Sequence, residues 1–318
     1  MRWGWAVALL SIAVAVYSQR DALVSDYVIS ADAFQHIWWM RSFQGPGLFE
    51  GDLLARYARN LQPFGLMGMY WLASFFVDPV WFSKVVPIFL LPLTGWFIFR
   101  LARHLSANDM TGLMTALSFV VTAVYLEHMA GGVSHSFGYP LLAAFLYFFL
   151  LKRPTGMALT LGMAVLFFPV VFAVGGLSWL LSLLLTRTKA REDRISLRAL
   201  VLAVLFGAAV MGGKLAVSSD PLIGRPFDRG AVSSLPEMTS AGRWPVWPVE
   251  DIFSATVRKA EGGFFLLGAL GRSELLSPAW KKVLLDWHIV FLTALVLASG
   301  WWFSRCRKAL SGFFFPVL

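Results

Sequence analysis

Long runs of apolar residues, separated by short polar segments, constrain this chain more than any other feature of its sequence. Hydrophobic residues make up 58% of the chain and charged residues only 14%, a composition that soluble domains do not have. The sequence therefore predicts an all-α polytopic membrane protein with about eight transmembrane helices, several of them shorter than the ~20 residues of an average span. The predicted spans are Trp3–Tyr17, Val80–Leu101, Met110–Leu126, Phe137–Leu151, Thr155–Phe168, Val170–Leu185, Ala199–Val217 and Val283–Phe303.

The formal net charge of +9 is explained by the side of the membrane on which the basic residues are expected to lie. If the apolar run Leu61–Val77 lies at or dips into one membrane surface without crossing, every basic cluster falls on the other side, as the positive-inside rule requires. These clusters are Arg2, Arg100/Arg103, Lys152/Arg153, Arg187–Arg198 and Arg305–Lys308. No basic helical stripe or soluble basic domain is visible, so we expect no nucleic-acid partner. We expect a bacterial-type inner membrane, with the N-terminus in the cytoplasm.

Three regions follow from this topology. They are a transmembrane core, 1–217, which includes a long first outer loop, 18–79; a second long outer loop, 218–282; and the last span with its tail, 283–318. Pro169 predicts two short spans within the apolar stretch around it, and one long tilted helix is the alternative. We expect the first span to be an uncleaved anchor. The final residues resemble the opening of another hydrophobic segment, which is compatible with truncation there.

Ionisable residues next to the membrane are the first candidates for function, because charged side chains are rare there. Residues 31–43 are predicted to form one amphipathic helix, with Asp32, His36 and Trp39 on a shared face. In the functional interpretation, Asp32 deprotonates an acceptor nucleophile and His36 tunes it. In the structural interpretation, Asp32 and Gln35 form a capping box at the start of the helix. The sequence leaves both open.

Basic residues near the same surface are candidates for binding a phosphate group. Asp52 precedes a predicted helix in which Arg56 and Arg59 share a face and can hold phosphate through forked hydrogen bonds. Lys84 and Lys214 lie near outer helix ends, where they either snorkel to the surface or contact a lipid phosphate. The remaining candidate of this kind is Arg243, in a loop with two tryptophans that suit sugar stacking as well as membrane anchoring.

A short loop between the third and fourth predicted spans carries three further candidates. Glu127, His128 and His135 are chemically able to bind substrate or a divalent metal such as Mg²⁺ or Mn²⁺, with Glu127 and His128 the candidate ligands, although their spacing matches no established metal motif. Gly131 and Gly132 allow close approach of the backbone, which suits either a phosphate cradle or a tight turn.

Together these residues resemble the GT-C superfamily of integral membrane glycosyltransferases, related to the polyprenyl-phosphate-sugar-dependent mannosyltransferases and the aminoarabinose transferases. The resemblance covers about residues 1–185. It rests on the acidic residue Asp32 after the first span, the juxtamembrane helices that follow it, Asp78-Pro79 with Lys84 and Pro87, Arg100-Leu-Ala-Arg103, and the segment from Gly131 to Pro140. The chain departs from the family in having Glu127-His128 where a paired acidic motif is usual, and family members are commonly longer.

The resemblance implies an enzyme that transfers a sugar from a polyprenyl-phosphate donor to a lipid, glycan or protein acceptor at the outer face of the membrane. It implies that Asp32 is the catalytic base and that Glu127 is the acidic residue of the second loop. A lipid-linked-substrate transporter or flippase and a non-catalytic scaffold subunit of an envelope assembly are the alternatives. The charges at the outer edge and the absence of matching broken helices favour the enzyme over the transporter.

Overall fold

The computed structural model describes residues 2–45, 47–122, 128–185 and 190–217, and these residues form helices and connecting turns without a β-strand. The α-helices are α1 (Arg2–Val24), α2 (Ala31–His36), α3 (Leu53–Leu61), α4 (Phe64–Ser74), α5 (Pro79–Ser106), α6 (Asp109–Val120), α8 (Gly138–Leu150), α9 (Pro154–Phe167), α10 (Pro169–Leu185) and α11 (Ala190–Val217). The 3₁₀ helices are η1 (Trp38–Phe43), η2 (Ala130–Gly132) and η3 (Ser134–Phe137). The all-α prediction is confirmed for this part of the chain.

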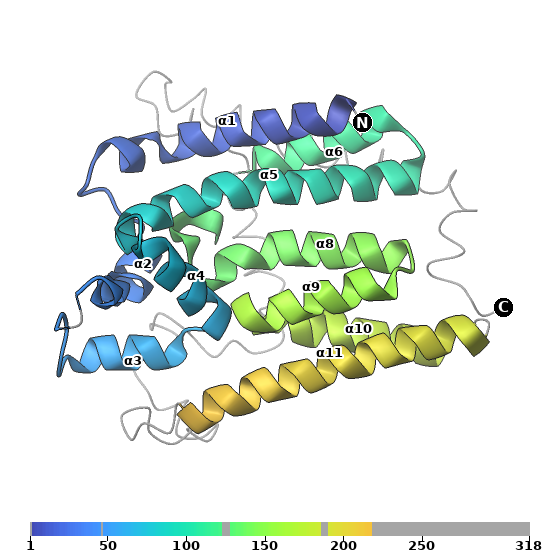
Figure 1. The fold of residues 1–318 in the computed structure, drawn as a ribbon. Helices are drawn as coiled ribbons and strands as arrows, with labels where there is room; N and C mark the ends of the chain where they lie inside the picture. The colour runs from blue at the N-terminus through green and yellow to red at the C-terminus, as the bar shows by residue number, and fades with distance from the viewer. Residues whose placement is uncertain (1, 46, 123–127, 186–189, 218–318) are drawn as a thin grey trace, which may run out of the picture.

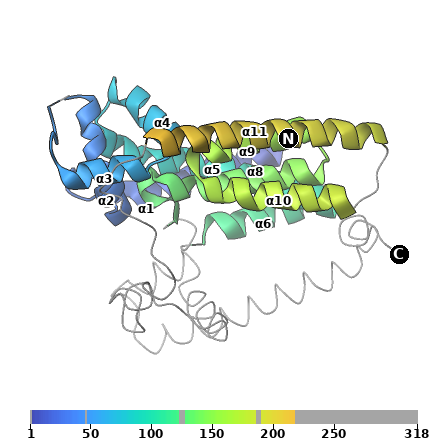
Figure 2. The same cartoon turned by 90° about the horizontal axis from the view of Figure 1, so that it is seen from below.

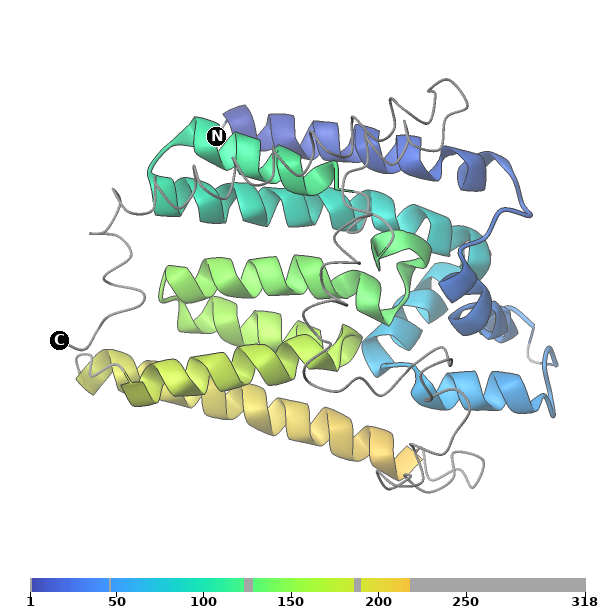
Figure 3. The same ribbon diagram turned by 180° about the vertical axis from the view of Figure 1, so that it is seen from behind.

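The long helices lie side by side in a bundle (Figure 1, and from behind in Figure 3). Helix α5 packs against α1 and α6 on one side and against α8 on the other, and α9 continues the bundle to α10 and α11. The long helices alternate in direction, so the C-terminal ends of α1, α9 and α11 lie at one end of the bundle (Figures 1 and 2). Helices α2, η1, α3 and α4 collect at that same end, and we call residues 25–78 the end layer.

Among the residues that the structure describes, three helices are long and apolar enough to cross a membrane, namely Trp3–Val24, Pro79–Ser106 and Ile195–Ala216. Within the described residues, helices occupy seven of the predicted span positions, but α6, α8, α9 and α10 have only 12 to 17 residues. A helix of 14 residues is about 21 Å long, which is less than the ~30 Å of the hydrocarbon core. The count of about eight spans therefore stays a prediction, and its last span lies outside the described residues.

The structure bears on two finer predictions about the helices, and it confirms the helix boundary at Pro169. Helix α9 ends at Phe167, where Phe168 leaves the helical conformation, and Pro169 begins α10, so the apolar stretch forms two helices that pack on each other. The run Leu61–Val77 contains the 11-residue α4, which packs against α9 and the start of α5. Such a helix is about 16 Å long, which is compatible with a position at the membrane surface, and the expectation that this run does not cross stays a prediction.

The opposite end of the bundle carries basic residues near the helix ends. The Arg100 guanidinium donates a hydrogen bond to the Tyr147 hydroxyl, with Nη2 at 3.0 Å. Arg103 forms an ion pair with Asp109 across the turn between α5 and α6. Lys152 and Arg153 occupy the turn between α8 and α9. The structure thus separates these basic clusters from the end layer, as the predicted topology requires.

The predicted single helix over residues 31–43 is wrong. The α-helix ends at His36, and the chain continues from Trp38 as the 3₁₀ helix η1. This break turns Trp39 away from the face of Asp32 and into a hydrophobic cluster, where its side chain is fully buried while Asp32 remains partly exposed. Burial of a large aromatic side chain outweighs the continuation of a short helix.

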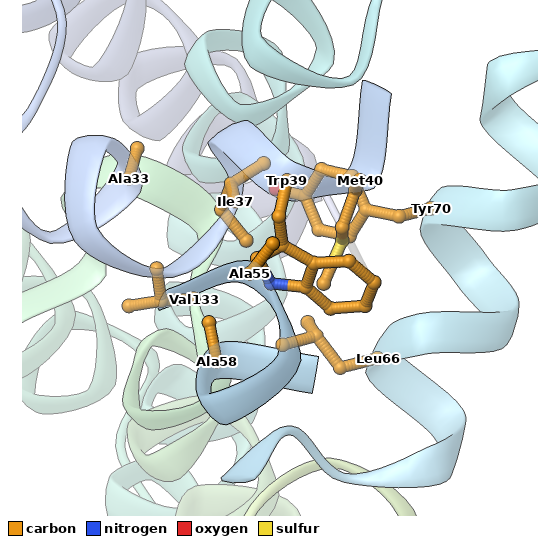
Figure 4. Packing of buried hydrophobic residues seen from close by; sticks show 9 residues of the cluster. All are labelled: Ala33, Ile37, Trp39, Met40, Ala55, Ala58, Leu66, Tyr70 and Val133. Carbon is orange, nitrogen blue, oxygen red and sulfur yellow. The ribbon is translucent and has the colours of Figure 1, made fainter. Parts of the chain in front are cut away.

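The core of the end layer is built from short segments of α2, η1, α3 and α4 and of the turn between η2 and η3, whose side chains Figure 4 shows. Trp39 and Tyr70 are its largest members, and both are fully buried. The other buried residues of this cluster are Ala33, Ile37, Met40, Ala55, Ala58, Leu66 and Val133. Val133 comes from the turn between η2 and η3, so the core also ties this turn to the end layer.

Candidate functional site

Two glycines set the geometry of the site, because both have left-handed backbone angles and both face other chain segments. Gly131 has φ of +80°, and a Cβ built on it would lie 2.9 Å from Ser30 Oγ at the start of α2. Gly132 has φ of +59°, and its Cβ would lie 2.8 Å from both the Tyr70 hydroxyl and Val86 Cβ. Glycine alone fits both requirements. The pair thus brings the η2–η3 turn into contact with α2, α4 and α5.

Hydrogen bonds hold this turn in place. The buried Tyr70 hydroxyl donates to the carbonyl of Gly132 at 3.1 Å. The Ser134 hydroxyl donates to the carbonyl of Phe167 at 2.5 Å, which attaches η3 to the end of α9. Ser136 is buried, and its hydroxyl donates to the carbonyl of Ala130 at 3.4 Å. The side chain of His135 therefore projects from a turn that is fixed at several points.

Asp32 and His135 meet at this turn. His135 Nε2 lies 3.5 Å from Asp32 Oδ2, and the two side chains are 36% and 43% exposed, so a substrate can reach both. Ser30 is the N-cap of α2, and no side chain caps that helix. The capping-box interpretation is therefore wrong, since Asp32 lies in the first turn and directs its carboxylate to His135. In that turn the carboxylate is also favourably placed relative to the helix dipole.

Two more histidines surround this pair. The imidazole centroids of His128 and His135 are 6.2 Å apart, and His128 also lies 6.0 Å from the ring of Tyr139. Burial lowers the pKa of His135; the Asp32 charge opposes this effect, and the nearby imidazoles of His128 and His36 add to it. His135 is therefore predominantly neutral at pH 7. The structure thus brings together four predicted residues, Asp32, His36, His128 and His135.

The predicted basic residues of α3 lie elsewhere in the end layer. Lys214, at the end of α11, donates to the carbonyl of Arg59 at 3.3 Å, and its ammonium lies 5.2 Å from the Phe64 ring. The Arg59 guanidinium lies 5.3 Å from the ring of Trp39. Arg56 is exposed on the same helix. The structure therefore brings the end of α11 against the helix that carries Arg56 and Arg59, although these segments are distant in sequence.

Two other predicted residues have structural partners. Asp52 is the N-cap of α3, where its Oδ1 accepts hydrogen bonds from the backbone N–H groups of Leu54 and Ala55. Lys84 is 4% exposed and donates to the carbonyl of Ser25 at 2.8 Å, which ties the chain after α1 to α5. The neighbouring carbonyl of Ser83 lies against Gly132, so Lys84 also borders the glycine turn. Their roles in substrate binding stay predictions.

Glu127 and Arg243 lie outside the described residues, so the separation of Glu127 from Asp32 stays untested. Among the described residues, no three His, Cys, Asp or Glu side chains are arranged to hold a metal ion. The predicted metal site of Glu127 and His128 stays a prediction, because Glu127 lies outside the described residues.

Tyr70 and the ion pair between Arg41 and Asp78 were not predicted from the sequence. Arg41 Nε lies 2.6 Å from Asp78 Oδ2, and Asp78 Oδ1 also accepts the N–H groups of Val80 and Trp81 at the start of α5. Burial works against ionisation of Asp78, but the hydrogen bonds and charge of Arg41 and the backbone N–H donors together lower its pKa. The sequence Asp-Pro before an apolar run is a helix-start signal that indicates Asp78 as a cap. No local pattern indicates its partner Arg41.

Comparison with known proteins gives no relative for this chain: no protein-family description, curated protein or solved structure matches it.

Proposed function

We propose that this chain is a membrane glycosyltransferase of the GT-C type, which transfers a sugar from a polyprenyl-phosphate donor to a lipid, glycan or protein acceptor. The observation that carries the proposal is the partly exposed carboxylate of Asp32, 3.5 Å from His135, whose imidazole has those of His36 and His128 nearby. A reachable carboxylate with nearby imidazoles suits proton abstraction from a hydroxyl group.

In the proposed reaction, Asp32 accepts the proton of the acceptor hydroxyl while the acceptor oxygen forms a bond to the anomeric carbon of the sugar. The bond between that carbon and the phosphate oxygen breaks, and the electron pair leaves with the polyprenyl phosphate. We assign the developing phosphate charge to the cations of Arg56, Arg59 and Lys214, which lie at the same end of the bundle as Asp32. Displacement in one step inverts the anomeric centre.

The proposed setting is a bacterial-type inner membrane, with the end layer on the outer face and the N-terminus in the cytoplasm. This orientation is supported by the basic residues at the opposite end of the bundle, because cytoplasmic ends of spans are enriched in Lys and Arg. A sugar donor with a polyprenyl tail reaches the site laterally from the bilayer. His36 and His128 then lie beside the reacting groups, where they can hold the acceptor.

The proposal is tested with the full chain in lipid nanodiscs and a panel of short-chain polyprenyl-phosphate sugars, each radiolabelled in the sugar. Membrane lipids and soluble glycans are supplied as acceptors. We expect one donor to be consumed, with release of polyprenyl phosphate and transfer or hydrolysis of the label. If the chain consumes none of the hexose or pentose donors under conditions that keep it folded, the transferase function is wrong.

A further inference from the structure

His135 differs from the other imidazoles near Asp32 because its backbone is fixed from several sides. Ser134 is tied to the end of α9, Ser136 to Ala130, and Val133 is buried in the core of the end layer. A side chain on such a turn has a well-defined position. Its Nε2 atom faces the Asp32 carboxylate at 3.5 Å.

Asp32 has less support of its own. It lies in the first turn of a six-residue helix that no side chain caps. In the part of the chain that the structure describes, its carboxylate contacts His135. A carboxylate that is 43% exposed retains considerable rotamer freedom unless a neighbouring group holds it. The position of this carboxylate therefore depends on His135.

We propose that His135 is a positioning residue that holds the Asp32 carboxylate in the orientation required for proton abstraction. This inference rests on the proposed function. A neutral imidazole that donates its Nε2–H toward the carboxylate orients it without removing its negative charge, as a second group commonly orients a catalytic base. When His135 becomes protonated, its positive charge stabilises the ionised carboxylate and makes it a weaker base.

The titratable and charged groups around His135 determine its titration midpoint. Helix α2 contributes Asp32 and His36, and His128 precedes η2. From the other elements packed against η2 and η3, the Tyr70 hydroxyl of α4 binds the Gly132 carbonyl and the Lys84 ammonium of α5 binds the Ser25 carbonyl. Helix α8 contributes Tyr139, beside His128, and α9 has no ionisable side chain. Among the described residues, Asp32 is thus the anion that acts on His135.

The first test detects the pair without any enzymatic assay. The full chain contains five histidines, so ¹⁵N-histidine labelling in nanodiscs gives a spectrum that substitution of each histidine assigns. We expect Asp32→Asn to lower the titration midpoint of His135, because the Asp32 charge favours the imidazolium. The control Asp52→Asn removes a carboxylate charge from the cap of α3 and should leave the midpoint unchanged. An unchanged midpoint in Asp32→Asn overturns the proposal.

The second test measures transfer with variants of His135. His135→Leu should lower kcat by about 10²-fold with little change in the KM of the donor, since misplacement of a catalytic group by about 1 Å has an effect of this size. His135→Gln retains an N–H donor near the Nε2 position and should restore most of kcat, while the acid limb of its pH profile shifts to lower pH. A purely structural role would not shift this limb.

The outcomes separate the two claims. If wild-type chain transfers sugar and His135→Leu retains full kcat, the positioning role is wrong while the transferase function stands. If the Asp32→Asn spectrum shows the pair but no wild-type transfer occurs with any donor, the proposed function is wrong, and the positioning role falls with it. Matched thermal unfolding of each variant excludes misfolding as the cause of a lost rate.

Discussion

Replacement of Gly132 by alanine tests the most specific feature of the site, the glycine turn. The new Cβ has to lie 2.8 Å from the Tyr70 hydroxyl and from Val86 Cβ, and 3.1 Å from the carbonyl of Ser83. The two nearest contacts are shorter than real Cβ atoms make, and neither the carbonyl of Ser83 nor the β-carbon of Val86 can move independently of α5. The residue also has to keep a φ of +59°, which alanine rarely adopts.

Both effects contribute to the expected loss of stability. The left-handed conformation costs an alanine roughly 1–2 kcal/mol. Insertion of a methyl group into a packed site costs about 1–3 kcal/mol. We therefore expect Gly132→Ala to destabilise the chain by about 2–5 kcal/mol, or to displace the turn that carries His135 and weaken its contact with Asp32.

Gly68→Ala is the matched control. Gly68 lies inside α4, in the same end layer, and a Cβ built there meets no atom within 4 Å. Alanine should therefore stabilise the helix at this position by roughly 0.5–1 kcal/mol. Both variants are compared by denaturant unfolding in mixed micelles, monitored by tryptophan fluorescence. The reasoning is refuted if Gly132→Ala unfolds at the same denaturant concentration as the parent chain, or if Gly68→Ala is the more damaging change.

Three further predictions concern the surroundings of the site. Tyr70→Phe should cost about 1–3 kcal/mol, because it leaves the buried Gly132 carbonyl without its donor, whereas Tyr57→Phe on the exposed face of α3 should be nearly neutral in the same unfolding assay. Asp78→Ala should lower the free energy of unfolding by about 1 kcal/mol, because α5 loses its N-cap. It should cost up to about 1 kcal/mol more than Asp52→Ala, which removes only the cap of α3, because Asp78 also pairs with Arg41. The pKa of Asp78 is lower in the folded state, so its ionised carboxylate stabilises the fold above the ordinary Asp pKa of ~3.9, and this stabilisation is lost as the pH falls through the lower folded-state pKa. In Asp78→Asn, the free energy of unfolding should therefore fall less steeply with decreasing pH. Lys214→Gln should lower kcat for the phosphate donor by about 10-fold, because it removes a cation assigned to the developing phosphate charge, and an unchanged kcat would argue against that assignment.

The helix positions and the placement of basic clusters at the end of the bundle opposite the end layer were predictable from the sequence, because both depend on local or one-dimensional patterns. Apolar runs fix where long helices form, and Pro169 fixes the boundary between α9 and α10. Asp32 and His135 were both selected as candidates, since each is a rare ionisable residue near a membrane surface. Their contact was not predicted, because it depends on how the glycine turn packs against α2.

The error over residues 31–43 has a specific physical cause. Helical spacing placed Trp39 beside Asp32, but Trp39 gains more from burial between α3 and α4 than from continuing the helix. Tyr70 was missed for the same reason, since its hydroxyl acts on a carbonyl that is 62 residues away in the sequence. Contacts of this kind depend on the three-dimensional packing of the end layer, which a single sequence does not encode in any local pattern.

The turnover of Asp32→Asn relative to the wild-type chain tests the central claim most directly. The measurement uses full-length protein in nanodiscs at saturating concentration of the donor that the wild type consumes, with Glu50→Gln as the control for loss of an exposed carboxylate in the same layer. We predict that Asp32→Asn loses at least about 10²-fold in kcat, within the usual contribution of a general base, and that Glu50→Gln keeps the wild-type rate. Transfer by folded Asp32→Asn at the wild-type rate would contradict the assignment of Asp32 as the catalytic base.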